Sequence, residues 1–519
     1  MARPHTHQAH RGGTGRARVA RVLVRLGAAW AVAGCPGGGQ GVGDHCDKVS
    51  DCADELQCLD HTCVARCVRA PECGDGYACS EDGTCSEALG QLGDRCGSEV
   101  ECAAGMTCRL DSDDLDGDGA LAASCRSESD GRAFADRCGS DDECRHGLCG
   151  LGLCLATCGD DRDCAVGFRC ARMPRVELAL APSFHACIPA NGVHRWEVPV
   201  PSPMAAVRVA VPEGVGSIAM LLSVQDPSQL VGAVEIVEPA PSRRVLYRRA
   251  ATLPEQLVYP VRHQAALRAS SFMLPPSPDV PVVAGAYDVT VSSFRASGAQ
   301  GSARPRAEIL AKMDDGVVLD LHFHFLDLAE HPCRDAFDEG GLDAERAQRS
   351  VSFQTAYVGQ LRALFARAGV ALGRVTYADL PDHPDLDGLD ASELHTLLAV
   401  PTTSGGVNVV LARTISPAGL MALHGGSPGD PSAGTTSSGG VAIGVDTLCL
   451  RDWRQLARIT AHAIARHMGL PRNREPDGSS DAIADSPDSA DNLLFYSELG
   501  GTDLSPHQRE LLRRSLVLR

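Results

Sequence analysis

One short stretch, residues 460–475, carries histidines and arginines at a spacing typical of a metal-binding helix. Two imidazoles at positions i and i+4 share one face of a helix and can hold zinc, with a glutamate beside the first histidine as general base. His462 stands at the first ligand position, but Ala463 occupies the position of the base. Arg466 occupies the second ligand position and Arg472 the third. The spacing of a zinc site is kept while its donors are missing.

Arginine cannot replace histidine as a metal ligand. Zinc needs lone-pair donors, whereas a guanidinium carries five N–H donors and no acceptor, so Arg466 would repel the ion. His467 cannot take its place, because position i+5 lies about 140° around the helix from His462. The alternative is that His462 is an ordinary polar residue on an amphipathic helix.

The residues around this stretch predict a helix. Asp452 and Gln455 form a capping-box start, and Gly469 followed by Pro471 predicts the end. A second capping box, at Ser505 with Pro506 and Gln508, predicts a final helix. Between Asp452 and Gly469, the apolar positions of the first helix follow helical spacing: Trp453, Leu456, Ala457, Thr460, Ile464 and Met468.

The stretch resembles the H-E-x-x-H-x-x-G-x-x-H helix of the metzincin zinc proteases, and most closely their bacterial pappalysin-like branch. The resemblance implies that residues 491–515 carry the methionine turn beneath the zinc, followed by a C-terminal helix. Leu494 stands where the methionine is expected. Ala463, Arg466, Arg472 and Leu494 therefore all depart from the family at functional positions, which indicates a pseudo-protease.

The first 34 residues are typical of a bacterial lipoprotein signal. They contain six arginines and no acidic residue, followed by a short apolar run that ends VAGC at Cys35. The small residues before Cys35 suit cleavage there and lipidation of its sulfur; an ordinary cleaved signal is the alternative. Residues 35–45 form a Gly-rich tether. We expect an exported protein that is lipid-anchored in the cell envelope.

The charge balance bears on partners. The formal net charge is −18, and it becomes −24 when the six arginines of the signal are removed. Neither nucleic acid nor an anionic membrane surface is a natural partner of such a chain. Contact with a membrane is expected only through the lipid.

Cysteines dominate residues 46–190. The chain has 23 cysteines, and 22 remain when Cys35 is set aside for lipid. Such density in an exported chain predicts disulfides, because loops rich in Gly and Asp bury too little apolar surface. A zinc-ribbon array is disfavoured because C-x2-C pairs are missing, and the pairing within each group stays open. The spacing resembles Dickkopf-like cysteine-rich repeats in five groups of four: 46/52/58/63, 67/73/79/85, 96/102/108/125, 138/144/149/154 and 158/164/170/187.

An acidic loop lies inside the third group. Asp114, Asp116, Asp118 and Gly119 match the start of a calcium loop, where oxygen ligands alternate. The twelfth position is Cys125 in place of a bidentate Glu, so an EF-hand is excluded. A solvated acidic loop and a weak calcium site both remain possible interpretations.

Residues 193–300 change in character. Alternating apolar segments broken by Pro and Gly predict an antiparallel β-sandwich without cysteine. Residues 305–519 then predict an α/β domain, matching the order of a metzincin upper lobe. Its expected strands are 317–328, 374–380, 407–414 and 440–447, and its expected first helix is 350–369.

Four further residues of the last domain bear on chemistry. Cys333 and Cys449 stand apart from the cysteine groups and should form a disulfide in an oxidising compartment. His322 and His324 share one face of the first strand, which raises a relocated metal site as a less favoured alternative.

Together these features predict a multidomain chain: disulfide-rich modules, an all-β sandwich and an α/β metzincin-like domain. We expect that domain to bind a protein or peptide ligand without cleaving it, and no cofactor beyond possible calcium. The alternatives are an active zinc metalloendopeptidase, which would need zinc, and a structural cell-surface stalk protein.

Overall fold

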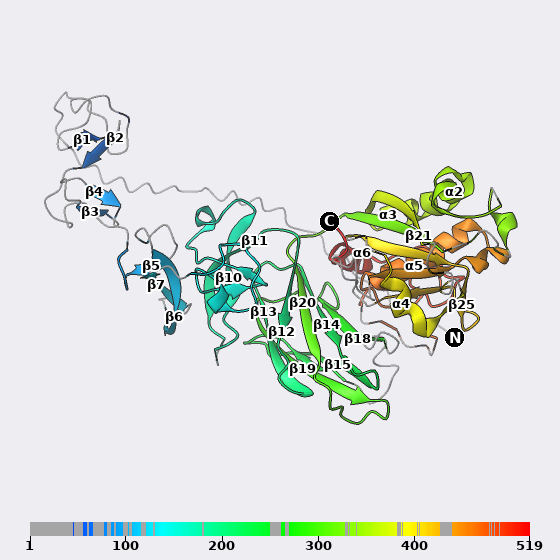
Figure 1. The fold of residues 1–519 in the computed structure, drawn as a ribbon, viewed down its shortest axis with the longest axis horizontal. Helices are drawn as coiled ribbons and strands as arrows, with labels where there is room; N and C mark the ends of the chain where they lie inside the picture. The colour runs from blue at the N-terminus through cyan, green and yellow to red at the C-terminus, as the bar shows by residue number, and fades with distance from the viewer. Residues whose placement is uncertain are drawn as a thin grey trace, which may run out of the picture. The chain divides into compact units, whose positions relative to one another are not determined.

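The computed structural model describes most of the chain after residue 89 (Figure 1). The described residues are 45, 56–59, 62–65, 77–79, 85–87, 90–96, 102, 106–115, 121–127, 130–178, 181–249, 261–264 and 269–519, the last with gaps at 327, 329–330, 332, 339, 381–382, 384–385, 387, 402, 404, 426–438, 477, 479, 482 and 487. The chain divides into two compact units, residues 1–88 and 89–519. The fold is multidomain, with disulfide-rich N-terminal modules and a body built mostly of β-sheet, as the sequence predicts.

The cysteine groups share one local structure, a β-hairpin in which the third and fourth cysteines lie opposite each other on the two strands. In the first unit, Cys58 faces Cys63 across a hairpin and Cys79 faces Cys85. The third, fourth and fifth groups place their last two cysteines opposite each other in the same way. The hairpin strands are β1 (Leu56–Leu59), β2 (Thr62–Ala65), β3 (Tyr77–Cys79), β4 (Cys85–Glu87), β6 (Met106–Leu115), β7 (Leu121–Ser127), β8 (Cys149–Gly150), β9 (Leu153–Cys154), β10 (Phe168–Pro174) and β11 (Ser183–Pro189).

Disulfides join the cysteines of each described group in one order, first to third and second to fourth. Because the third and fourth cysteines face each other, both bridges leave the same end of the hairpin and hold the preceding loop against it. β5 (Arg95–Cys96) adds a third strand to the hairpin of group three. The six bridges are Cys96–Cys108, Cys102–Cys125, Cys138–Cys149, Cys144–Cys154, Cys158–Cys170 and Cys164–Cys187.

The later modules pack onto the next domain. Leu148, Leu155 and Phe184 are buried in the same apolar cluster as Val209 and Val291 of the sandwich. Thr157 Oγ1 donates a hydrogen bond to the Cys108 carbonyl at 3.3 Å, which links groups five and three. Groups four and five therefore share an apolar core with the sandwich and are not independent modules.

Two antiparallel sheets form the β-sandwich. One sheet has the order β12-β20-β14-β18-β17 and the other β13-β19-β15-β16. β20 pairs with β12 and β14, so the sandwich extends past the residue 300 that the sequence predicts. Its strands are β12 (Val193–Val198), β13 (Met204–Val211), β14 (Ser217–Ser223), β15 (Gln229–Val237), β16 (Val245–Arg248), β17 (Val261–Gln264), β18 (Ala269–Leu274), β19 (Gly285–Arg295) and β20 (Arg306–Lys312).

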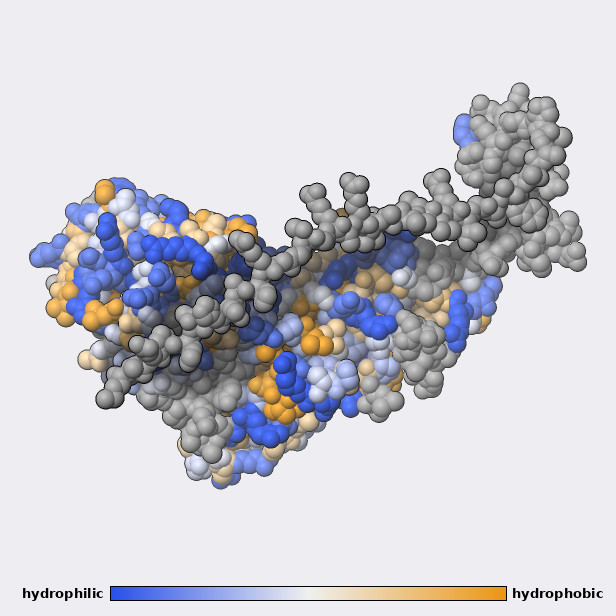
Figure 2. All heavy atoms as spheres, turned by 180° about the vertical axis from the view of Figure 1, so that it is seen from behind, coloured by the Kyte–Doolittle hydropathy of each residue, from blue (hydrophilic) through white to orange (hydrophobic). Residues whose placement is uncertain are grey.

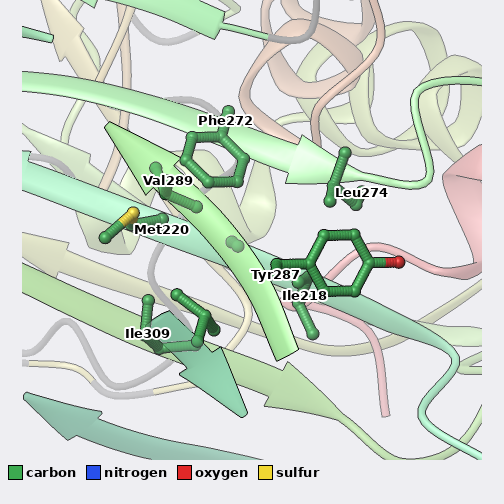
Figure 3. A pocket seen from close by; sticks show the side chains of 9 residues that line it. Ile218, Met220, Phe272, Leu274, Tyr287, Val289 and Ile309 are labelled. Atoms are coloured by element: carbon green, nitrogen blue, oxygen red, sulfur yellow. The ribbon is translucent and has the colours of Figure 1, made fainter. Parts of the chain in front are cut away.

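The interior of the sandwich is a closed apolar core. Tyr287 and Val289 of one sheet face Met220, Phe272 and Ile309 of the other (Figure 3). These side chains leave no space large enough for a ligand. The sandwich interior is therefore a packing element and not a binding pocket.

A five-stranded sheet organises the last domain, in the order β22-β21-β24-β27-β26. β21 pairs in parallel with β22 and β24, and β24 pairs in parallel with β27, while the edge strand β26 is antiparallel. The strands are β21 (Val318–Phe325), β22 (Ala371–Asp379), β24 (Val407–Ala412), β26 (Ala422–His424) and β27 (Gly440–Gly444), with a separate short pair β23 (Gly388–Asp390) and β25 (Thr414–Ser416).

Helices cover both faces of this sheet (Figure 1). The larger core lies under α3 (Gly359–Arg367) and α5 (Trp453–His467), where Phe323, Phe353 and Trp453 pack together. The opposite face is covered by residues around α4 (Leu394–Leu398). Two further helices are α2 (Ala344–Arg349) and α6 (Pro506–Arg513), and a π-helix spans Ser352–Val358. None of the described helices is long and apolar enough to cross a membrane.

Residues 514–519 join the sandwich to the α/β domain. Lys312 of β20 donates to the Leu518 carbonyl at 2.7 Å, and Ser217 Oγ donates to the Arg514 carbonyl at 2.7 Å. Arg519 pairs with Asp320 of β21 at 3.0 Å. Hydrophilic residues cover much of the described surface in Figure 2, and apolar residues are interspersed among them.

Candidate functional site

The site is built around α5, which begins where the sequence predicts. Asp452 accepts a hydrogen bond from the Gln455 backbone at 2.8 Å, and Gln455 Oε1 accepts one from the Asp452 backbone. The helix ends at His467, and Gly469 follows with φ of +108°, a conformation that residues with a side chain rarely adopt. The predicted capping box and the glycine stop are confirmed.

A hydrogen bond fixes the tautomer of His462. Its Nδ1 lies 2.9 Å from the Leu493 carbonyl oxygen, which can only accept, so Nδ1 carries the proton and Nε2 keeps its lone pair. A hydrogen bond of this kind from the second ring nitrogen normally fixes the tautomer of a ligating histidine. Burial lowers the pKa of His462 from 6.5 to about 3. The positive charges of Arg458, Arg466 and Arg472 also lower this pKa, whereas the hydrogen bond to Leu493 raises it.

The two positions that the sequence predicts as further ligand positions hold arginines in defined contacts. Arg466 is buried and its Nη1 donates to the Leu470 carbonyl at 3.3 Å, at the end of the helix. Arg472 donates from Nη1 to Glu475 Oε2 at 2.7 Å. Glu475 is 2% exposed, so this is a buried carboxylate neutralised by a partly exposed guanidinium.

Ala463 lies in the apolar core beneath α5, at 3% exposure. A glutamate there would begin from a buried position and would need to be desolvated. The helix face that presents His462 therefore offers one lone pair, no carboxylate base and three neighbouring guanidinium groups. This donor set does not fit zinc.

The turn beneath His462 is held by a residue that the sequence analysis missed. Arg458 lies one helical turn before His462 and is buried, at 6% exposure. Burial lowers its pKa to about 10. Its guanidinium donates to four backbone carbonyls of the turn: Leu493 at 3.0 Å, Phe495 at 3.4 Å, Ser497 at 2.8 Å and Gly501 at 3.1 Å. The i to i+4 spacing indicates that Arg458 and His462 share a helix face, but it does not predict these backbone partners.

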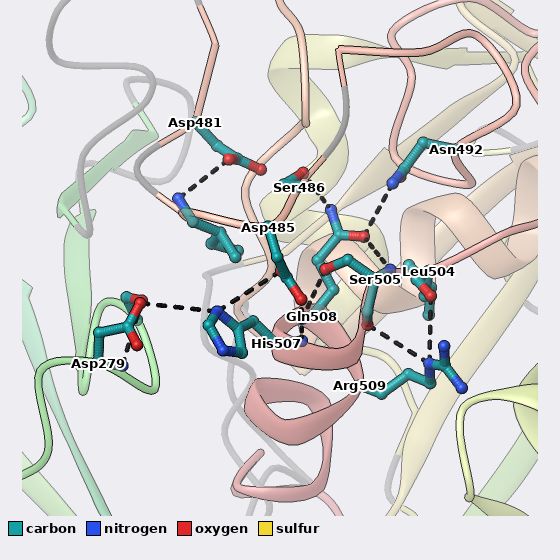
Figure 4. Close-up of polar contacts among 12 residues, drawn as sticks. Asp279, Asp481, Asp485, Ser486, Asn492, Leu504, Ser505, His507, Gln508 and Arg509 are labelled. Carbon is teal, nitrogen blue, oxygen red and sulfur yellow. Dashed lines mark hydrogen bonds and ion pairs between the residues drawn. The ribbon is translucent and has the colours of Figure 1, made fainter. Parts of the chain in front are cut away.

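Leu494 occupies the centre of that turn and is fully buried. Its backbone N–H donates to Asn492 Oδ1 at 2.8 Å. Asn492 Nδ2 in turn donates to Gln508 Oε1 at 2.8 Å (Figure 4). Gln508 closes the capping box with Ser505, which confirms the predicted start of α6. The predicted turn residue and the predicted helix start thus belong to one hydrogen-bonded unit.

The two histidines of β21 are both buried and hydrogen-bonded. His322 contacts Thr376 Oγ1 at 2.7 Å through Nδ1 and the Gly405 carbonyl at 2.9 Å through Nε2. His324 Nε2 contacts Asn408 Oδ1 at 2.9 Å. Burial lowers the pKa of both imidazoles. Both ring nitrogens of His322 are engaged, which leaves no lone pair for a metal.

The structure tests the predicted disulfide of the α/β domain but not the predicted calcium residues. Cys333 and Cys449 form the predicted disulfide, with their Cα atoms 4.9 Å apart. Among the described residues, the clusters of three or more potential metal-ligating groups consist only of disulfide-bonded cysteines. Cys35, Asp116 and Asp118 lie outside the described residues, and Asp114 is described only as part of strand β6.

Comparisons with known proteins identify no family. No family model matches the chain, and no curated protein matches it. Among solved structures, the chain is similar to one titled "Structure of infectious bursal disease virus Gt strain", at 8% identity and a TM-score of 0.12. The match covers 24% of this chain and spans 34% of the viral one. A likeness at this score defines no shared fold.

Proposed function

We propose that this chain is an exported lipoprotein of the bacterial cell envelope whose last domain is a metzincin-like pseudo-protease. In this proposal the domain binds proteins or peptides and does not cleave them. The observation that carries it is the pairing of His462 with the Leu493 carbonyl above a buried Leu494, while Arg466 and Arg472 fill the remaining ligand positions.

The residues that hold His462 in place are those expected around a metal ligand, whereas the other two ligand positions carry arginines. This contrast favours a metal site that has lost its ligands while the surrounding fold is kept. The tautomer of His462 is fixed as a ligand's would be, and Arg458 holds the turn below it with four hydrogen bonds. A histidine that was merely a polar surface residue would need neither arrangement. The helix-covered sheet, with a mostly parallel strand order, is consistent with the α/β domain that the metzincin resemblance implies.

The proposal puts the ligand on the part of the α/β domain that α5 covers. β26 lies last in the strand order, and α5 packs against β26 and β27. The helix that carries His462 therefore lies against the antiparallel end of the sheet.

Metal content and peptide binding test the proposal on the purified full chain. We expect no stoichiometric zinc, no cleavage of an unfolded protein substrate, and saturable binding of peptides from a digest of that substrate. Zinc at one ion per chain that is lost in His462→Ala would contradict the proposal and favour an active zinc endopeptidase. Absence of both zinc and peptide binding would favour the structural stalk protein.

The lipid anchor has a separate test. Replacing the sulfur in Cys35→Ala removes the atom that would carry the lipid. The protein should then move from the membrane fraction to the soluble fraction of cells. An unchanged distribution would contradict the anchor and leave the proposal for the last domain intact.

A further inference from the structure

A histidine lies between two carboxylates where the β-sandwich meets α6 of the α/β domain (Figure 4). His507 is the second residue of α6, and its Nδ1 lies 3.5 Å from Oδ1 of Asp485 in the same domain. The same nitrogen lies 3.6 Å from Oδ2 of Asp279, in the loop between β18 and β19 of the sandwich. One imidazole therefore faces an acidic group from each domain.

The nitrogen that faces the carboxylates makes no hydrogen bond. His507 Nδ1 and Asp485 Oδ1 are buried atoms, and neither has a hydrogen-bond partner within the described residues. Their separation of 3.5 Å exceeds the usual N···O distance of a charge-assisted hydrogen bond, about 2.7 to 2.9 Å. The three groups are therefore placed for an ion pair that a neutral imidazole does not complete.

The two carboxylates are held unequally. Asp485 Oδ2 accepts the backbone N–H of His507 at 3.0 Å, so this carboxylate is bound to the first turn of α6 whatever the charge of the imidazole. Asp279 is the one charged residue in residues 275–284, and its side chain is 55% exposed. Its Oδ2 accepts from the Ser277 hydroxyl at 3.4 Å, a long hydrogen bond. The contact that depends most on the charge of His507 is thus the one that crosses to the sandwich.

The other charged groups near the start of α6 have partners of their own. Glu510, one turn further along the helix, accepts from Arg514 at 2.6 Å. Arg509 donates to two backbone carbonyls at the helix start. On the preceding loop, Asp488 pairs with Arg474 at 3.0 Å. In the described part of the chain, the charged groups in contact with the imidazole are therefore the two carboxylates.

The far end of α6 is fixed to the sandwich by different contacts. Ser217 Oγ donates to the Arg514 carbonyl at 2.7 Å, and Leu516 is buried against Ala219 and Leu310. Neither contact includes a group that changes its charge between pH 8 and 5. The histidine therefore adds a titratable contact to a joint that is otherwise held by packing and neutral hydrogen bonds at this helix.

We propose that His507 is a link between the β-sandwich and the α/β domain that acid strengthens. A neutral imidazole is attracted weakly to either carboxylate, whereas an imidazolium is attracted to both at once. Aspartates are ordinarily ionised above about pH 4, and histidine gains its charge between about pH 8 and 5, so the opposite charges coexist in mild acid. The link strengthens as pH falls through this window and weakens as pH rises. It is independent of the proposed peptide-binding function.

The alternative is that His507 acts within the α/β domain alone, through Asp485. Both arrangements place a positive imidazole beside the start of α6. They differ in whether the sandwich takes part, and Asp279 is the residue that separates them. Asp279→Asn keeps the shape of the side chain and removes the charge that crosses the joint.

Hydrogen exchange measures the link in the full chain. Exchange in residues 275–284 and 505–509 is followed by mass spectrometry at pH 5.5 and 7.5, and the rates are corrected for their intrinsic dependence on pH. We expect the protection of both segments to be about threefold higher at pH 5.5, the size of a partly exposed ion pair. Residues 407–412 of β24 lie in the core and serve as the reference, whose protection should not rise.

Variants assign the effect to the two residues. His507→Gln removes the titrating group and should make the protection of both segments independent of pH. Asp279→Asn should remove most of the rise. His395→Gln is the matched control, because His395 is also half-buried near a helix start but contacts the Ser392 carbonyl and the Thr396 hydroxyl. This variant should keep the full rise.

Thermal unfolding of each variant at pH 7.5 checks that the fold is kept. Asp279→Asn changes an exposed loop residue, so it tests the link even where His507→Gln loses stability. Equal protection at the two pH values in the wild-type chain, or an unchanged rise in His507→Gln, would overturn the proposal. A rise that is lost in His507→Gln and kept in Asp279→Asn would confine His507 to the α/β domain and overturn the link. Loss of the rise in His395→Gln would overturn the assignment to His507.

Discussion

The third cysteine module and the α/β domain are held together by opposite means. In the module, the buried cluster consists of Cys96, Cys102, Cys108, Cys125 and Ala123, so the disulfides themselves are its core. In the α/β domain, strands and helices bury a large set of aliphatic and aromatic side chains, and one disulfide lies at its edge. The difference shows covalent bonds replacing an apolar core where the chain is too short to build one.

Modules four and five are intermediate between these extremes. They have the same two disulfides per group, but Leu148, Leu155 and Phe184 also join the core of the sandwich. Their stability therefore has a covalent part and a packing part. This gradation along the chain gives the comparison consequences that can be measured.

Reduction should produce the largest effect. The two disulfides of module three close loops of 12 and 23 residues, and a disulfide closing a loop of this size contributes about 3 kcal/mol. With both reduced, the module keeps little apolar burial beyond Leu121, which joins the sandwich core. Residues 90–127 should therefore become open to protease while residues 317–519 stay protected. Limited proteolysis with mass spectrometry after mild reduction measures this.

The control for this experiment removes only the disulfide of the α/β domain. Cys333→Ala with Cys449→Ala removes the single bridge of that domain, whose apolar core remains. The domain should lose stability but stay folded, with its amide protection largely kept. Unfolding of the double variant at 25 °C would contradict the division between covalent and apolar stabilisation.

Arg458 should be the most sensitive single residue of the α/β domain. Arg458→Met fills a similar volume but leaves four carbonyls of the turn without their donor. Unsatisfied buried acceptors make a loss of about 3 kcal/mol in unfolding free energy the expected result. The matched control is Arg454→Met, one helical turn earlier on the exposed side of α5. Denaturant unfolding of both variants decides, and equal losses would contradict the role given to Arg458.

A bound metal would add a second stabilising link to the α/β domain, beside the Cys333–Cys449 disulfide. Arg466→His and Arg472→His together supply two lone pairs beside Nε2 of His462, whereas each single change supplies only one. At a zinc concentration 100 times the dissociation constant, binding should stabilise the double variant by about 2.7 kcal/mol. Thermal unfolding with and without zinc measures the shift.

The wild-type chain and both single variants should show no such shift with zinc. Adding Ala463→Glu should restore a base but cost stability, because position 463 lies in the apolar core. A zinc-dependent shift in Arg466→His alone would contradict a three-ligand requirement.

The sequence predicted the features that depend on neighbouring residues. Asp452 with Gln455 and Ser505 with Gln508 fixed two helix starts, and Cys333 and Cys449 were paired because they stand apart from the groups. The Arg472–Glu475 pair lies beyond the end of α5, where helical spacing gives no guide to ion pairs.

Features that depend on distant contacts were not predictable from the sequence. The order of disulfides within each module follows from which cysteines face each other across a hairpin, and spacing alone does not give that register. The partners of Arg458 lie 35 to 43 residues away and are backbone oxygens, which have no signature in the sequence. β20 was assigned to the α/β domain of residues 305–519, because its pairing with β12 spans more than one hundred residues.

Mild acid should produce the smallest effect, and it should act through the buried imidazoles of the α/β domain. Burial lowers the pKa of His322, His324 and His462, so the folded domain holds these imidazoles neutral. The unfolded chain takes up their protons below about pH 6.5. It then binds more protons than the folded state, and the unfolding free energy falls as pH decreases from 7 to 5. Carboxylates with a lowered pKa, such as Asp320, add their own loss only below about pH 4.

One substitution isolates the contribution of His462 to this pH dependence. In His462→Asn the amide Nδ2 can still donate to the Leu493 carbonyl, but the side chain no longer titrates. The variant should therefore unfold with a shallower dependence on pH between 7 and 5 than the wild-type domain. Protease protection of residues 317–519 across this range measures it. An unchanged slope would mean that His462 takes up a proton in the folded state, contrary to the neutral imidazole that its burial favours.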